Sequence, residues 1–144
     1  MKNVFWTGNE KDADYANLLG GAKKLTLDPN TKVYLLPNPK STRTADYIVV
    51  RKGIFKDYDL KTISGQNSVG NRLSESVGQS RRVVLNMCTD YNPRTLANEI
   101  QDYFFSNDDA MEVLILKGKK RIPVNRKAIM DNYYMQNFLK IWWK

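Results

Sequence analysis

The sequence of 144 residues contains no histidine and only one cysteine, Cys88. A single cysteine excludes an internal disulfide, and the usual zinc sites are excluded because they need several histidine or cysteine ligands. The absence of histidine also excludes Ser-His-Asp and Cys-His catalysis, together with the paired-histidine acid–base chemistry of many metal-free ribonucleases. Any metal ion bound by this chain must therefore be a hard cation held by oxygen ligands.

Long hydrophobic runs are absent as well. The apolar run Val4-Phe5-Trp6 is far too short for a signal peptide, and no segment approaches the roughly 20 apolar residues of a membrane-spanning helix. We therefore expect no membrane insertion of this domain, and any export signal would lie elsewhere. With 42% hydrophobic residues, the chain is long enough to form one domain over residues 1–144 with a sizeable core.

Acidic residues are outnumbered by basic ones, 15 against 23, which gives a net charge of +8. Such a charge favours binding to polyanions, because each neutralised phosphate releases condensed counterions. Nucleic acid is the natural partner, although a generic basic surface explains the charge equally well. The basic residues cluster at residues 117–121, at Arg126-Lys127 and at Arg81-Arg82, and we favour contact between these patches and an RNA backbone.

Periodicity and turn signals predict an α/β (α+β) fold with a central mixed β-sheet flanked by helices. We expect helices over residues 9–20, 66–79 and 93–105, and strands over residues 33–36, 45–51, 54–63, 82–87, 111–116 and 122–124. The first helix is expected to stop at Gly20-Gly21. The core spans residues 9–125, and the apolar spacing of the tail predicts a terminal helix over residues 126–144 that packs on it. Base stacking or a protein partner is the alternative role for this tail.

The longest expected strand carries charges on one face. Its two-residue period places Asp57, Asp59 and Lys61 together, and Asp46 begins the neighbouring strand, where its carboxylate can meet that of Asp59. Because a buried unpaired charge costs several kcal/mol, such a face must be solvated, paired or built around an ion. Two carboxylates and the Leu60 carbonyl suit Mg²⁺ or Mn²⁺, with the lysine beside an attacking water. An exposed hairpin face with Asp-Lys pairs is the alternative.

The spacing of these residues resembles that of a known superfamily. Asp46 followed by Asp59-Leu60-Lys61, inside the order α-β-β-β-α-β, resembles the PD-(D/E)XK nucleases. The stretch from Ala45 to Leu85, which contains Gln79-Ser80, looks more closely like the C-terminal tRNase domains of contact-dependent growth-inhibition toxins and related polymorphic toxins. The resemblance covers about residues 33–125.

This resemblance implies a function and a biological setting. It implies a metal-dependent endonuclease toxin domain that uses Mg²⁺ or Mn²⁺ to hydrolyse tRNA in interbacterial competition. Such a domain is secreted or delivered as part of a larger bacterial toxin and acts in the cytoplasm of the target cell. A cognate immunity protein neutralises it in the producing cell.

The resemblance also assigns roles to individual residues. It makes Asp46 and Asp59 metal ligands, Lys61 the catalytic lysine, and Gln79 a polar group of the site on the neighbouring helix. One departure is that Ala45 stands where the family motif has proline.

Further candidates lie around this centre. Family members often add an acid from the first helix, which Glu10 or Asp14 would supply as a third metal ligand, although acids there commonly complement the helix dipole. Polar residues at the junction of the strand and the next helix are candidates for phosphate binding, although such residues commonly cap helices. These candidates are Thr62, Ser64, Ser68, Asn71 and Arg72.

Two other functions stay open from the sequence. One is a metal-independent, barnase-like ribonuclease toxin in which Lys61, Thr62 and Gln79 act on a 2′-hydroxyl. The other is a non-catalytic, basic nucleic-acid-binding module whose Asp-x-Lys triplet is a surface ion pair. RNA and DNA are not distinguished either, because no sequence pattern shows contacts to the 2′-hydroxyl.

Overall fold

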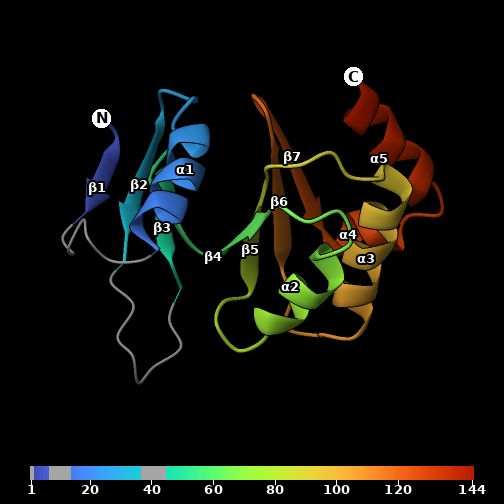
Figure 1. Ribbon diagram of the computed structural model, residues 1–144. Coiled ribbons are helices and arrows are strands. Elements are labelled where there is room, and N and C mark those ends of the chain that lie inside the picture. The colour runs from blue at the N-terminus through green and yellow to red at the C-terminus, as the bar shows by residue number, and fades with distance from the viewer. Residues whose placement is uncertain (1, 7–13, 37–44) are drawn as a thin grey trace.

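The computed structural model describes residues 2–6, 14–36 and 45–144. These residues form a mixed seven-stranded sheet and five helices (Figure 1). The strands lie in the sheet in the same order as in the chain. They are β1 (Val4–Trp6), β2 (Thr31–Leu35), β3 (Tyr47–Arg51), β4 (Ile54–Ile63), β5 (Arg82–Met87), β6 (Glu112–Lys117) and β7 (Lys120–Asn125).

At β4 the pairing between neighbouring strands changes from antiparallel to parallel. This strand pairs antiparallel with β3 and parallel with β5, which in turn is parallel to β6. Parallel neighbours need crossover connections, and the helices between these strands provide them. The helices are α1 (Tyr15–Leu25), α2 (Val69–Glu75), α3 (Pro93–Phe105), α4 (Arg126–Met130) and α5 (Tyr134–Trp143).

The sheet has a hydrophobic core on each face. Helix α1 covers one face, where Leu18, Ala22 and Leu25 pack among side chains that include Tyr58 and Leu60 of β4. The other four helices gather on the opposite side (Figure 1), and their larger core includes side chains from β4, β5, β6 and β7. The strand that carries the expected site therefore lies between two layers of helices.

Several predicted elements are confirmed at the expected bounds. Strands 54–63 and 82–87 and helix 93–105 coincide with β4, β5 and α3. The helix expected over residues 66–79 is shorter, because α2 ends at Glu75 and Gly78 then adopts a φ of 88°. Sequence patterns did not predict β1, which pairs in parallel with β2.

The prediction that the first helix stops at Gly20-Gly21 is wrong, because α1 runs through both glycines to Leu25. A Cβ atom at Gly21 would lie 2.5 Å from the Tyr47 hydroxyl oxygen. That hydroxyl donates a hydrogen bond to the Leu18 carbonyl. Glycine is needed here for close packing of the helix on the sheet, and not as a stop signal. The start expected for this helix, residues 9–13, lies outside the described residues.

The terminal helix expected over residues 126–144 is divided. It consists of α4 and α5, separated at Asp131, whose carboxylate accepts a hydrogen bond from the Tyr133 backbone amide at 2.8 Å. Tyr134, Phe138 and Trp142 of α5 are buried in the larger core, so the tail packs on the sheet as predicted. Within the described part of the chain, no helix combines the length and apolar character needed to cross a membrane.

Candidate active site

Asp57, Asp59 and Lys61 form a row of charged side chains on one face of β4, and the C-terminal part of this row is buried. Asp59 is 1% exposed and Lys61 is 8% exposed, while Ile63 in the same row belongs to the core under α2 and α3. Tyr58 and Leu60 point into the opposite core. The predicted placement of the aspartate and the lysine on one face is therefore confirmed. An exposed hairpin face does not describe these two residues.

Asp59 is surrounded by donors from the end of α2 and the turn that follows it. The Ser76 hydroxyl donates to Oδ2 of Asp59 at 2.7 Å. The Gln79 amide, oriented so that its nitrogen meets the carboxylate, donates to the two oxygens at 2.8 and 2.9 Å. The Lys61 ammonium lies 3.5 Å from Oδ2. These neighbours fix the Asp59 carboxylate in a buried position.

Asp46 approaches the same point from the adjoining strand. It precedes β3, and backbone hydrogen bonds with Leu36 and Tyr58 fix its main chain. Its Oδ2 accepts a hydrogen bond from the Leu60 amide at 2.7 Å. Burial, together with the Asp59 carboxylate beside it, raises the pKa of Asp46 to about 7, against the smaller opposing effect of the Leu60 amide. The two carboxylates therefore meet, as predicted.

Asp46 and Asp59 are the side chains of this centre that could hold a metal ion. Mg²⁺ keeps several waters and needs only one or two carboxylates, supplemented by substrate phosphates. The described residues contain no group of three acidic, cysteine or histidine side chains that could hold an ion. The expected third ligand Glu10 lies outside the described residues, and Asp14 stands before α1 without joining such a group. Burial is the main cause of the raised pKa of Asp46, and a divalent cation bound at this carboxylate would favour its ionised form.

Lys61 has a second acidic neighbour that the sequence did not reveal. Its ammonium lies 3.9 Å from Oε2 of Glu75, and the same oxygen lies 3.4 Å from the Arg72 guanidinium. Ser76 was also missed, although it is buried and donates to Asp59. The only sequence signal was position, because Ser76 and Gln79 are three residues apart in a segment expected to be helical.

The predicted phosphate-binding residues are only partly brought together. Arg72 joins the centre through Glu75, whereas Thr62 faces the opposite side of β4, and its hydroxyl has no hydrogen-bond partner among the described residues. Ser64 and Asn71 are exposed. The Ser68 hydroxyl donates to the Gly65 carbonyl at 2.9 Å instead of capping α2.

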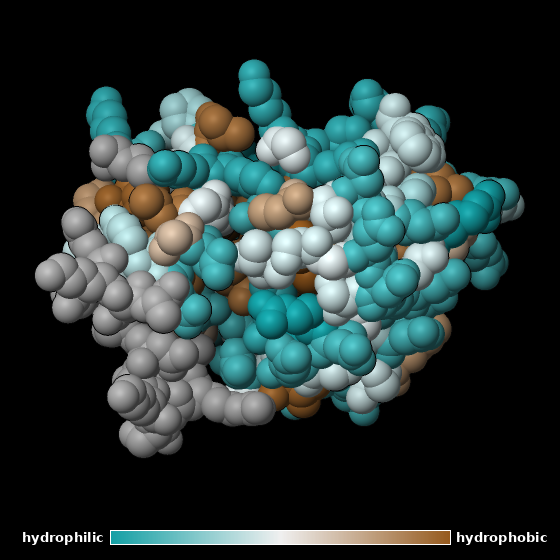
Figure 2. Space-filling model, viewed as in Figure 1, coloured by the Kyte–Doolittle hydropathy of each residue, from teal (hydrophilic) through white to brown (hydrophobic). Residues whose placement is uncertain are grey.

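Most of the molecular surface seen in Figure 2 is hydrophilic, with hydrophobic side chains scattered over it.

Comparisons of the chain with protein-family models, curated proteins and solved structures found no match.

Proposed function

We propose that this protein is a metal-dependent endonuclease of the PD-(D/E)XK type and the toxin domain of a bacterial tRNase. The observation that carries the proposal is the burial of Asp59 and Lys61 on one face of β4, next to the carboxylate of Asp46. Buried charges of this kind are costly, and pairs of acids with a raised pKa occur preferentially at functional sites.

The architecture supports the proposal in two ways. The order α1-β2-β3-β4-α2-β5 is the αβββαβ order that the resemblance implies. Asp46 stands at the start of β3, while Asp59 and Lys61 occupy β4 and Gln79 follows α2. These are the positions in which that order would bring the four residues together.

In the proposed mechanism, Asp46 and Asp59 would hold Mg²⁺ or Mn²⁺, and Lys61 acts on the reacting groups. A bound ion would supply a water of lowered pKa and positive charge beside the scissile phosphate. Ser76 and Gln79 hold the Asp59 carboxylate in place. The Lys61 ammonium orients the attacking water and stabilises negative charge that develops on the phosphate.

The substrate and the biological role rest on the resemblance. The net charge of +8 supports a polyanionic substrate, since basic surfaces concentrate nucleic acid. A cognate immunity protein that covers a basic cleft would present an acidic surface. An inhibitor whose contacting surface proved neutral or basic would contradict this part of the proposal.

The proposal is tested by incubating total tRNA with the purified protein, with Mg²⁺ or Mn²⁺ and with a chelator. We expect metal-dependent cleavage that is lost in Asp59→Ala and in Lys61→Ala. Lys56→Ala is the matched control, because Lys56 lies on the same strand, on the other face, in a partly exposed pair with Glu112 at 3.7 Å. Circular dichroism of each variant separates loss of activity from loss of folding.

The other outcomes point to different functions. Cleavage that survives the chelator and leaves a 2′,3′-cyclic phosphate would support a metal-free ribonuclease, although Thr62 lies on the opposite face from Lys61. Absence of cleavage of both tRNA and duplex DNA would support a non-catalytic binding module. In that case loss of basic residues in the segment 117–121 should weaken binding and reduce its salt dependence.

A further inference from the structure

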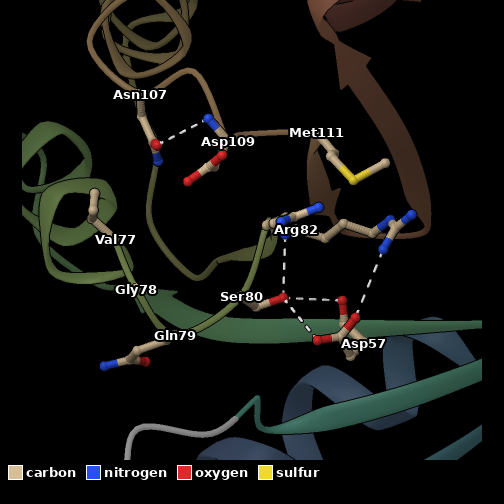
Figure 3. A pocket seen from close by; sticks show the side chains of 10 residues that line it. Asp57, Val77, Gly78, Gln79, Ser80, Arg82, Asn107, Asp109 and Met111 are labelled. Atoms are coloured by element: carbon tan, nitrogen blue, oxygen red, sulfur yellow. Dashed lines mark hydrogen bonds and ion pairs between the residues drawn. The ribbon is translucent and has the colours of Figure 1, made fainter.

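Basic residues outside the catalytic centre gather in two places, of which the first is a pocket beside it. This pocket of about 590 Å³ is formed by the turn after α2, the start of β5 and the loop between α3 and β6 (Figure 3). Two arginines and two aspartates line it, and the Arg82 guanidinium lies 3.7 Å from the Asp57 carboxylate. The lining therefore carries no net charge that would attract a phosphate.

The second place is the surface where the turn between β6 and β7 meets the end of α5. Residues 117–121 and 138–144 include six lysines and arginines and no acidic residue. The Lys120 ammonium donates to the carbonyls of Ile141 and Trp142 at 3.2 and 2.8 Å. These hydrogen bonds fix the end of α5 against the turn, and Trp142 anchors the helix in the larger core. The two segments therefore form one fixed, basic surface.

An exposed indole stands on this surface. Trp143 is 72% exposed, whereas its neighbour Trp142 is 3% exposed. The Lys117 ammonium lies 3.9 Å from the centroid of the Trp142 ring and 5.6 Å from that of Trp143, which is within the range of cation–π contacts. Lys140 is exposed one turn before Trp143, on the same face of α5. The Trp143 indole is thus flanked by ammonium groups on a rigid support.

Two lysines of this surface are free to bind a ligand. Lys119, in the turn, and Lys140 are exposed and form no hydrogen bond or ion pair with any residue that the structure describes. Lysine ammonium groups that neutralise phosphates gain binding energy from the release of counterions. Proteins that hold single-stranded nucleic acid combine such cations with an aromatic ring on which a base stacks. The charge and the exposed indole together are complementary to an unpaired stretch of nucleic acid.

A membrane surface is the other anionic partner for lysines and an exposed tryptophan. A helix that binds a membrane interface buries a broad apolar face among the lipids. The apolar face of α5, formed by Tyr134, Phe138 and Trp142, is instead buried in the protein core. The observations therefore favour nucleic acid.

We propose that the end of α5 and the β6–β7 turn form a second RNA-binding site, separate from the catalytic centre. An unpaired base stacks on the exposed indole of Trp143, which Lys117 holds in place. Lys119 and Lys140 contact the phosphates on either side of this base. The choice of RNA rests on the proposed nuclease function.

The sheet places this second site near the catalytic lysine. Lys117 is aligned with Met87 of β5, which is aligned with Ile63 of β4. Lys61 precedes Ile63 by two residues, so the main chains at Lys61 and Lys117 are about 12 Å apart. A tRNA is much larger than this separation, and one molecule can contact both sites. The second site would therefore contribute to substrate affinity and not to the chemical step.

Binding is measured without cleavage by titrating a fluorescent single-stranded 2′-O-methyl oligouridylate in the presence of chelator. The chelator blocks a metal-dependent reaction, and the methyl group blocks attack by the 2′-hydroxyl. We expect Trp143→Ala to weaken binding about fivefold or more, which is the effect of losing one stacked base, and Trp143→Phe to retain most of the affinity. Tyr133→Ala is the matched control, because Tyr133 is 64% exposed at the opposite end of α5.

The salt dependence of the same binding tests the lysines. Loss of one phosphate contact should reduce the slope of log Kd against log salt concentration by about 0.7. We expect this reduction in Lys119→Gln and in Lys140→Gln. Lys32→Gln is the matched control and should leave the slope unchanged, because Lys32 is an exposed lysine on β2, far across the sheet from β6 and β7.

Oligonucleotide binding that Trp143→Ala and Lys140→Gln leave unchanged would overturn the inference, as would absence of binding. Sedimentation with vesicles that contain phosphatidylserine tests the membrane. Vesicle binding that is lost in Trp143→Ala, while oligonucleotide binding is unchanged, would assign the surface to a membrane and also overturn the inference.

Cleavage kinetics with tRNA separate this inference from the proposed function. If both hold, Trp143→Ala should raise KM for tRNA about fivefold or more and leave kcat near the wild-type value. Cleavage with an unchanged KM in this variant would keep the nuclease and refute the second site. Trp143-dependent RNA binding by a protein that cleaves neither tRNA nor DNA would keep the binding site and refute the nuclease.

Discussion

The two halves of β4 carry similar charged side chains in different surroundings. In the first half, the Asp57 side chain is 56% exposed and pairs with Arg82, and Phe55 is 70% exposed. In the second half, Asp59 and Lys61 face the end of α2 and are buried. An exposed ion pair of the first kind contributes under about 1 kcal/mol, whereas a buried charge must be held by specific partners.

The difference arises from what covers the strand. The first half pairs with β3 in a hairpin, and the second half pairs with β5, to which it is connected through α2. The crossover that parallel pairing requires therefore places Ser76 and Gln79 over Asp59. The same connection that encloses the acid also provides its hydrogen-bond donors.

The largest expected loss of folding stability comes from replacing a charged residue in the buried half of β4. Asp59→Ala leaves Lys61, Ser76 and Gln79 without their common partner, and breaking a buried pair in this way costs about 3–5 kcal/mol. Asp57→Ala should change the free energy of unfolding by less than about 1 kcal/mol. Urea denaturation of both variants measures the contrast. Equal effects of the two substitutions would contradict the difference between the two halves.

A smaller loss of folding stability is expected from a substitution in α1, which packs on the other face of β4. A Cβ at Gly21 would lie 2.5 Å from the Tyr47 hydroxyl and 3.1 Å from a methyl group of Leu60, so Gly21→Ala overpacks this core and should cost about 1–3 kcal/mol. Gly20→Ala is the matched control, because its Cβ would meet nothing closer than 3.9 Å. It should be neutral or stabilising by up to about 1 kcal/mol. Thermal unfolding of the two variants distinguishes close packing from helix propensity.

The acid pair itself predicts an effect of pH on stability. The folded-state pKa of Asp46 is about 7, above its ordinary value of 3.8, so the folded protein binds more protons than the unfolded chain between these pH values. The stabilising contribution of the protonated group is complete below about pH 4 and is lost as the pH rises to 7, by up to about 1.4 kcal/mol per pH unit. Asp46→Asn should remove this slope and unfold at a higher temperature than the wild type at pH 8.

The same variant tests metal binding. Mg²⁺ or Mn²⁺ should raise the midpoint of thermal unfolding of the wild type at pH 8 more than at pH 6, because the ion replaces a proton. Asp46→Asn should show little of this increase. A midpoint that rises equally in both proteins would show that the ion binds somewhere else.

Sequence patterns predicted the parts of this molecule that depend on local periodicity. They gave the bounds of β4, β5 and α3 and the shared face of Asp59 and Lys61. They failed where tertiary contacts override a local signal. The glycines of α1 were read as a helix end although they permit close packing against Tyr47.

At the end of α2, beside the candidate active site, a tertiary contact again overrides the local sequence pattern. Its apolar spacing suggested a helix as far as Gln79, but α2 ends at Glu75 and Val77 is 45% exposed. Ser76 turns inward to Asp59, and Gly78 adopts a positive φ. No local pattern indicates that a partner on β4, 17 residues away, decides where this helix ends.

The smallest expected effect concerns Glu75, which lies at the edge of the buried half and contacts both Lys61 and Arg72. Its side chain is 55% exposed, so Glu75→Gln should change the free energy of unfolding by no more than about 0.5 kcal/mol. A substrate phosphate that binds the Lys61 ammonium and the Arg72 guanidinium must compete with the Glu75 carboxylate, which also repels it. Neutral glutamine should therefore lower KM for RNA severalfold while kcat stays near the wild-type value. Steady-state cleavage kinetics measure both constants, and a large fall in kcat would instead place Glu75 among the groups that position Lys61 for the reaction.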